Sequence, residues 1–300
     1  MEAFVTDRAN QPAMQHSPTP DPPLRDFLPG SQIEIINPNL ERGKVRSVLF
    51  DFDGTLSLIR EGWQQVMAPM MVEILLDLNT GESGDELTAV VTDYVDRLTG
   101  KQTIYQMMAL AEQVKQRGGE PLDPVEYKHM YLDRLWQRIE GRVAALKRGE
   151  TEPDDMLVPG SRGLLTALHE RGVSLYLASG TDEPYVLDEA RALQVDGFFG
   201  ERIYGALDDY KRFSKAMIIN RIIQTHGLAG PEFLAFGDGY VEIENTKDVG
   251  GIAVGVATDE ARREGVDHWK RTRLIGAGAD VIIPEFREHG RLISHLFGED

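Results

Sequence analysis

The sequence contains no cysteine among its 300 residues. Disulfide bonds, thiolate nucleophiles and thiolate metal sites are therefore excluded, and the composition fits a reducing compartment such as the cytoplasm. Long apolar runs are also lacking: none approaches the roughly 20 residues that span a membrane, and residues 1–11 show no signal-like basic start with an apolar stretch. We therefore expect a cytoplasmic protein without a membrane partner.

Positive charge is scarce as well. The chain has 32 basic and 49 acidic residues, which gives a net charge of −17. This charge repels the phosphates of nucleic acids at long range, so a nucleic-acid partner is not expected. A small anionic substrate remains compatible with it, provided that a metal ion and a few local cations reverse the field at the binding site.

The N-terminal 30 residues contain little apolar side-chain material and hold five prolines between Gln11 and Pro23. This composition predicts a disordered leader over residues 1–30. The alternating residues 33–36 that follow predict a short edge strand.

Residues 59–155 show the periodicity of amphipathic helices, broken by glycine-rich turns. Short connections between such helices are typical of an antiparallel bundle. The predicted helices cover residues 60–78, 84–99, 102–117 and 124–148.

Strands alternate with helices after residue 156, which predicts a parallel sheet with right-handed crossovers. The predicted helices are 161–171, 183–193, 213–226, 241–249 and 285–297, and the strands are 173–178, 197–199, 232–236, 252–256 and 279–283. Together with an apolar strand before residue 51, they predict an α/β fold. A Rossmann-like core (31–58 and 156–300) would be interrupted by a helical cap domain (59–155) that lies over the ligand crevice.

The strand before residue 51 ends abruptly on Asp51 and Asp53, and Gly54 supplies a turn. The carboxyl ends of parallel strands form the ligand crevice of such sheets. Two ionised carboxylates at this edge raise the free energy of the folded state unless a cation is present. Mg²⁺ prefers oxygen ligands of this kind. On its own, the pattern is equally compatible with an acidic turn of no functional importance.

Two further strands end in polar residues, Ser179-Gly180-Thr181 and Gly237-Asp238-Gly239, with Glu242 one helical turn beyond. These strand ends are expected at the same edge as Asp51, so their side chains should converge. Asp51 and Asp238 are candidate ligands for a divalent cation, with Glu242 in support.

The same residues suit phosphoryl transfer. A carboxylate can attack phosphorus to form an acyl phosphate, and Asp53 is suited to protonate the leaving alkoxide. Ser179 and the backbone of Gly180 can donate to phosphoryl oxygens, and Lys211 supplies positive charge.

These motifs resemble those of the haloacid-dehalogenase-like (HAD) hydrolase superfamily, in the helical-cap subgroup that contains phosphoglycolate phosphatase and β-phosphoglucomutase. Residues 51–55 match its first motif, Ser179 its second, Lys211 its third, and Gly237-Asp238 with Glu242 its fourth. The resemblance covers about residues 44–300. It implies Asp51 as a nucleophile that forms an aspartyl phosphate, Asp53 as general acid/base, and Mg²⁺ as cofactor. The metal ligands would be Asp51, Asp238, Glu242 and the backbone carbonyl of Asp53.

The chain departs from the family pattern in two places. Glu242 stands where Asp is more usual, and the third motif lacks the common Lys-Pro pair. Lys215 is therefore an alternative to Lys211. We favour Lys211, because Lys215 is expected to lie a full turn inside the following helix.

A carboxylic acid at position 53 fits transfer from oxygen, so the resemblance implies a phosphatase acting on a small phosphorylated metabolite, a sugar or organic-acid phosphate. A phosphomutase and a non-catalytic domain that binds a phosphorylated ligand or partner are the alternatives. The residues predicted to contact phosphate or substrate are Thr55, Gly180, Thr181, Arg60 and Lys101, with Trp63 and Thr103 as further cap candidates.

Overall fold

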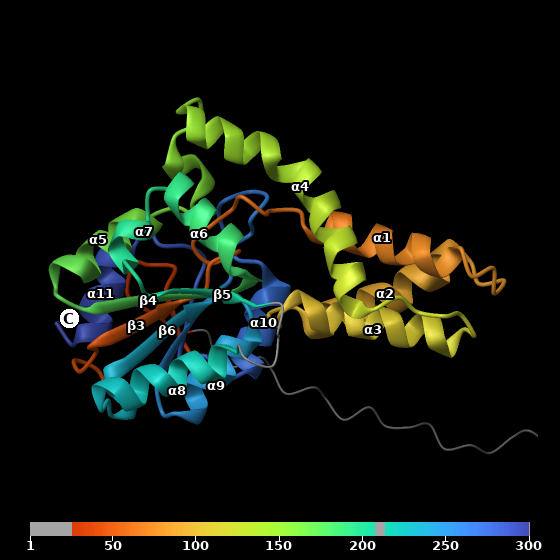
Figure 1. The fold of residues 1–300 in the computed structure, drawn as a ribbon. Helices are drawn as coiled ribbons and strands as arrows, with labels where there is room; N and C mark the ends of the chain where they lie inside the picture. The colour runs from red at the N-terminus through yellow and green to blue at the C-terminus, as the bar shows by residue number, and fades with distance from the viewer. Residues whose placement is uncertain (1–25, 208–213, 300) are drawn as a thin grey trace, which may run out of the picture.

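A computed structural model of the chain describes residues 26–207 and 214–299. Within them a mixed sheet has the strand order β1-β2-β8-β7-β6-β3-β4-β5, with β3 to β8 parallel and β1 and β2 added antiparallel at one edge. This is the predicted α/β fold (Figure 1). The strands are β1 (Asp26–Phe27), β2 (Glu34–Ile35), β3 (Ser47–Phe50), β4 (Ser174–Asp182), β5 (Ile203–Ala206), β6 (Phe233–Gly237), β7 (Ile252–Val256) and β8 (Val281–Ile283).

Helices cover both faces of this sheet, α5, α6, α7 and α11 on one side and α8 and α9 on the other (Figure 1). Alternate residues of β3 serve the two faces: Val48 and Phe50 pack in one apolar core and Leu49 packs in the other. The helices are α5 (Ser161–Glu170), α6 (Glu183–Ala192), α7 (Asp196–Phe199), α8 (Lys215–His226), α9 (Tyr240–Asp248), α10 (His268–Gly276) and α11 (His289–Phe297).

Four further helices follow β3 and extend to one side of the sheet (Figure 1). They are α1 (Gln64–Leu76), α2 (Gly84–Leu98), α3 (Thr103–Gln116) and α4 (Pro124–Arg148). The helical prediction for this segment is confirmed, with ends up to four residues shorter. None of the described helices is long and apolar enough to cross a bilayer. The assignment of this segment as a separate cap domain stays a prediction.

Local signals explain where these helices start. The side chain of Ser83 accepts a hydrogen bond from the N–H of Glu86, and Glu86 bonds back to the N–H of Ser83, a capping box at the start of α2. Asp123 caps α4, and Pro124 occupies its first position, where the missing N–H is not needed.

Several predicted boundaries are wrong. Residues 197–199 belong to the short helix α7, and the strand lies later, at Ile203–Ala206. Helix α10 was not predicted at all. Residues 26–30, assigned to a disordered leader, contain β1, which pairs with β2; residues 1–25 lie outside the described part. The strand expected at 33–36 is present as β2, although β1 forms the edge.

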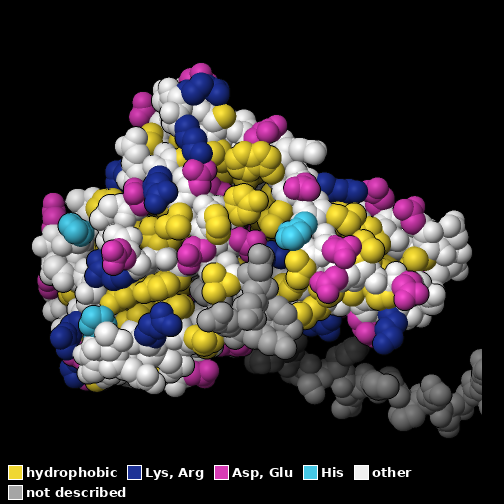
Figure 2. Space-filling view, viewed as in Figure 1, with side chains coloured by type: hydrophobic (Ala, Val, Ile, Leu, Met, Phe, Trp, Pro, Cys, Tyr) yellow, Lys and Arg dark blue, Asp and Glu magenta, His cyan; other side chains and the backbone are white. Residues whose placement is uncertain are grey.

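The face shown in Figure 2 carries acidic and basic side chains mixed together. On this face the acidic excess of the chain therefore forms no large patch of a single charge.

Strand β3 lies between β4 and β6, and Phe50 pairs in register with Leu177 and Phe236. The residues that follow these three strands are therefore brought to one edge of the sheet, which is where the candidate site lies.

Candidate active site

Asp51 lies at the end of β3 and is 6% exposed. Its Oδ1 accepts a hydrogen bond of 2.8 Å from the N–H of Phe52, and its Oδ2 lies 2.9 Å from the Nζ of Lys215. Burial raises the pKa of Asp51 well above its ordinary value; Lys215 opposes this shift, while Glu242 and Asp238 add to it. The carboxylate of Asp51 is thus held where additional positive charge would stabilise its ionised form.

Three carboxylates meet at this point. Asp51, Asp238 and Glu242 each offer an oxygen, and these oxygens lie within 4.8 Å of one another. Hard oxygen ligands at this separation suit Mg²⁺. The buried negative charge also favours a cation, so this donor set fits the metal expected from the sequence.

Lys211, the favoured residue, lies outside the described residues. Lys215 contacts this cluster. Its Nζ lies 2.9 Å from both Asp51 Oδ2 and Glu242 Oε2. The expectation that Lys215 lies a full turn inside a helix is wrong, because Ser214 caps α8 and Lys215 is its first residue. An N-terminal position directs the lysine toward the strand ends.

Glu242 is almost fully buried, and both of its oxygens have protein partners. Oε2 is paired with Lys215, and Oε1 accepts a hydrogen bond of 2.6 Å from the N–H of Gly239. The predicted support of the metal is compatible with its position. Through its ion pair, Glu242 also holds Lys215 next to Asp51.

Asp238 is fixed by Thr55. The Thr55 hydroxyl accepts a hydrogen bond of 2.9 Å from the N–H of Asp238 and lies 3.3 Å from Asp238 Oδ1. Gly54 has a φ of +75°, and a Cβ there would lie 2.3 Å from Asp238 Oδ2. Thr55, predicted to bind phosphate, is thus fully buried and contacts the metal-ligand candidate Asp238. At position 54, only glycine fits beside Asp238.

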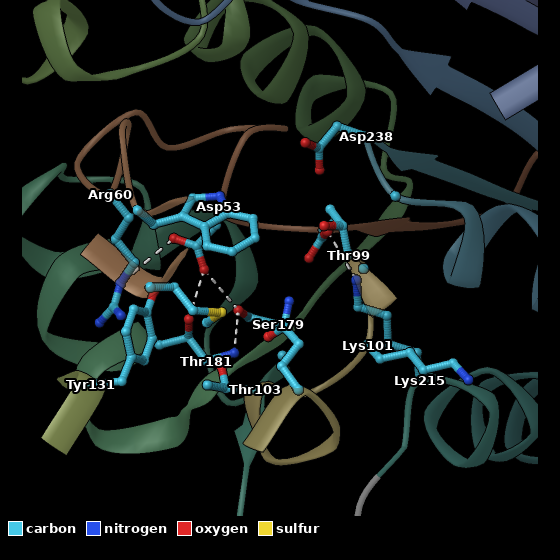
Figure 3. Close-up of a pocket in the computed structure, with 17 residues that line it drawn as sticks. Asp53, Arg60, Thr99, Lys101, Thr103, Tyr131, Ser179, Thr181, Lys215 and Asp238 are labelled. Carbon is cyan, nitrogen blue, oxygen red and sulfur yellow. Dashed lines mark hydrogen bonds and ion pairs between the residues drawn. The ribbon is translucent and has the colours of Figure 1, made fainter. Parts of the chain in front are cut away.

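Asp53 points toward the second motif (Figure 3). Its Oδ2 accepts hydrogen bonds from the hydroxyls of Ser179, at 3.1 Å, and Thr181, at 2.8 Å. Its Oδ1 is buried, has no hydrogen-bond partner among the described residues, and lies 3.7 Å from the Nε of Arg60. One oxygen of Asp53 is therefore oriented by two hydroxyls while the other faces a guanidinium.

Arg60, predicted to contact substrate, is buried and committed to Glu189 on α6. Its Nη2 donates to Glu189 Oε1 at 2.7 Å, and its Nε donates to the same oxygen at 3.1 Å. Burial would lower the pKa of Arg60, but Glu189 and Asp53 raise it above its ordinary value. Arg60 is therefore a fixed positive charge beside Asp53.

A cavity of about 100 Å³ opens directly over these groups (Figure 3). Asp51, Asp53, Ser179, Lys215 and Asp238 form its floor. Its other lining residues come from the helical segment, the second motif or the fourth motif: Arg60, Trp63, Met67, Thr99, Gly100, Lys101, Thr103, Gln106, Tyr131, Gly180, Thr181 and Gly239. This partly open space is lined by residues from both the sheet and the helical segment.

The loop between α2 and α3 is seated on the strand ends. A Cβ at Gly239 would lie 2.9 Å from the Cα of Gly100, and a Cβ at Gly180 would lie 3.4 Å from the carbonyl oxygen of Lys101. Such close backbone packing requires small residues and brings Lys101 to the cavity.

A lysine that contacts a candidate metal ligand was missed. Lys270, on α10, donates to Asp238 Oδ2 at 2.8 Å and to Glu260 Oε1 at 2.5 Å. Lys270 and its neighbour Arg271 are both held in ion pairs, and the guanidinium of Arg271 pairs with Glu34. The one available signal was Asp267, which caps α10 and fixes the start of the helix.

The sequence profile of the haloacid dehalogenase-like hydrolases matches residues 45–250, more than half of the chain. The chain belongs to the haloacid dehalogenase-like hydrolase family. The matched residues include the four sequence motifs and helices α1 to α4. The family identification made from the sequence is confirmed.

Two kinds of relatives are consistent with this. Phosphoglycolate phosphatase of Escherichia coli K12 is 26% identical over 228 residues, covering 74% of this chain and 85% of the relative. β-Phosphoglucomutase from Clostridium difficile and a predicted phosphoglycolate phosphatase from Haemophilus somnus share the fold, with TM-scores of 0.57 and 0.53. Their identities are 13% and 18%; they cover 85% and 83% of this chain, and this chain covers 98% of each. The chain is thus a HAD-like hydrolase, and the sequence relative named above is a phosphatase.

Proposed function

We propose that this HAD-like enzyme is a Mg²⁺-dependent phosphatase that hydrolyses a small phosphorylated metabolite through an aspartyl phosphate on Asp51. The observation that supports this most is the position of Asp51. It lies at the floor of the cavity, in contact with Lys215 and beside two further carboxylates, with Asp53 on the opposite side. Nucleophile, charge stabilisation and proton donor are thus all present around one small space.

The first step transfers the phosphoryl group to the enzyme. A carboxylate oxygen of Asp51 attacks phosphorus, and the bond from phosphorus to the ester oxygen breaks. The departing alkoxide takes a proton from Asp53, which must therefore begin this step protonated. Ser179 and Thr181 hold the Asp53 oxygen that they contact, so the proton is delivered from a fixed direction.

The second step regenerates the enzyme. Asp53, now ionised, takes a proton from a water molecule, and the resulting oxygen attacks phosphorus. The bond between Asp51 and phosphorus breaks, inorganic phosphate leaves, and Asp53 is protonated again. Arg60 stabilises the ionised Asp53 between the two steps, since its guanidinium lies 3.7 Å away.

Positive charge must balance the phosphoryl oxygens during both steps, because charge stabilisation dominates phosphoryl transfer. Lys215 supplies part of it from a buried position. Asp51, Asp238, the backbone carbonyl of Asp53 and, in support, Glu242 would hold the Mg²⁺ that supplies the rest by polarising phosphoryl oxygens and neutralising their charge.

Removal of the metal should stop the reaction. Treatment with EDTA is expected to abolish phosphate release, and added Mg²⁺ should restore it, because the acidic cluster would otherwise repel an anionic substrate. The measurement is phosphate release from an aryl phosphate. Activity that survives exhaustive metal removal would contradict the role given to Asp238.

The substrate is proposed to be small, because the cavity has a volume of only about 100 Å³. Lys101 and Thr103 line it on the side of the inserted helices and would contact the part of the substrate that does not react. A cationic and a hydroxyl side chain favour a leaving group with a carboxylate or hydroxyls, which agrees with the phosphoglycolate phosphatase relatives. A panel of phosphorylated organic acids and sugars, compared by kcat/KM, tests this class.

Lys101→Ala should raise KM for the best organic-acid substrate by about 10- to 100-fold, because this is the loss of binding that removal of one charge-assisted hydrogen bond causes. The kcat value should change much less, since Lys101 does not contact the reacting groups. Lys115→Ala, an exposed lysine at the end of α3, is the matched control and should behave as wild type. An unchanged KM in Lys101→Ala would remove this residue from substrate recognition.

A further inference from the structure

Lys270 is engaged with a proposed metal ligand, yet the proposed reaction gives it no task. It lies in the first turn of α10, in a segment that follows β7 and is separate from the four motifs. Its side chain is 11% exposed, and its Nζ lies 2.8 Å from Asp238 Oδ2 and 2.5 Å from Glu260 Oε1. A buried ammonium group is thus placed directly behind the carboxylate that faces the cluster.

The two oxygens of Asp238 have different surroundings. Oδ1 lies beside the Thr55 hydroxyl, and Oδ2 accepts the hydrogen bond from Lys270. Gly54 packs against the Oδ2 side, where a Cβ would leave no space. Asp238 is therefore held in one orientation by three neighbours, of which only Lys270 carries a charge.

The charge of Lys270 acts against a metal ion. A carboxylate that is already paired with an ammonium group attracts a second cation less strongly, and in a partly buried site the charge of that ammonium group is not fully screened. Glu260 acts in the opposite sense, because it shares the ammonium group with Asp238 and adds negative charge nearby.

We propose that Lys270 is a positioning residue that orients Asp238 and, with Glu260, sets how tightly the site binds Mg²⁺. This inference rests on the proposed function, since it takes Asp238 as a metal ligand. It adds a control of metal affinity by a charge pair outside the four motifs. The pair makes the affinity weaker than the carboxylates alone would give.

The test is calorimetric titration of the purified full-length protein with MgCl₂, which needs no turnover. Lys270→Met should bind Mg²⁺ at least about tenfold more tightly than wild type, and Lys270→Arg should stay close to wild type. Glu260→Gln should bind several-fold more weakly, because Lys270 then pairs with Asp238 alone. Two partners of one ion pair would thus shift the affinity in opposite directions.

A purely structural ion pair predicts a different pattern, in which loss of either partner lowers the melting temperature and leaves Mg²⁺ affinity unchanged or weaker. Lys247→Met is the matched control, because Lys247 pairs with the buried Asp280 away from the cavity. It should lose stability without a change in Mg²⁺ affinity. Lys270→Met that binds Mg²⁺ as wild type does, or more weakly, overturns the inference. Failure of the wild type itself to bind Mg²⁺ would instead overturn the proposed function.

Discussion

Asp51→Asn is expected to lower kcat by a factor of at least about 10³, because the amide cannot attack phosphorus. The fold should be retained. Asparagine has the same shape, and the substitution removes one of three carboxylates that lie together in a buried cluster. The melting temperature should therefore equal or exceed that of the wild type. Phosphate release and thermal unfolding, measured on the same preparation, give both quantities.

The matched control is Asp133→Asn, an exposed aspartate on α4 that should leave kcat unchanged. Rapid acid quenching followed by mass spectrometry adds a direct test. The wild type should show a phosphorylated peptide containing Asp51 during turnover, and Asp51→Asn should show none. A folded Asp51→Asn variant with more than about one part in a thousand of the wild-type activity would argue against a covalent intermediate on this residue.

The motif residues were predictable because of where each stands relative to an apolar run. Asp51, Ser179 and Asp238 each follow an apolar run that ends abruptly near the end of a strand, and parallel strands place such ends at one edge. The inserted helices were predictable for a related reason, since periodic apolar residues and glycine breaks are local signals. The elements and site residues were predicted correctly where the signals for them lie in neighbouring residues of the sequence.

The contacts between the motifs were not predictable in this way. Thr55 was assigned to phosphate as a residue of the first motif, and Arg60 was assigned to substrate as a residue at the start of the helical segment. The structure engages them with Asp238 and Glu189 instead. Lys270 was missed because α10 buries Leu274 as its only fully covered apolar residue and so lacks a clear apolar stripe. Its partner Asp238 is 32 residues away, and no spacing rule connects the two.

Lys215→Met is expected to lower kcat by about 10²- to 10³-fold, whereas Lys211→Met should stay within a few-fold of wild type. The reason is the position of the Lys215 ammonium group, 2.9 Å from the proposed nucleophile. Removing a preorganised charge beside a reacting group costs about 3–4 kcal/mol of transition-state stabilisation. The pair of variants decides between the two lysines that the third motif offers, by phosphate release at saturating substrate and Mg²⁺.

Stability is the main confounding effect in this experiment, because Lys215→Met leaves the buried Glu242 without its ion-pair partner. The double variant Lys215→Met/Glu242→Gln removes both charges and should fold better while remaining as inactive as Lys215→Met. If the single variant is inactive only because it unfolds, the double variant should recover activity as it recovers stability. If Lys211→Met loses activity and a folded Lys215→Met keeps it, the catalytic charge belongs to Lys211, and Lys215 serves only to neutralise Asp51 and Glu242.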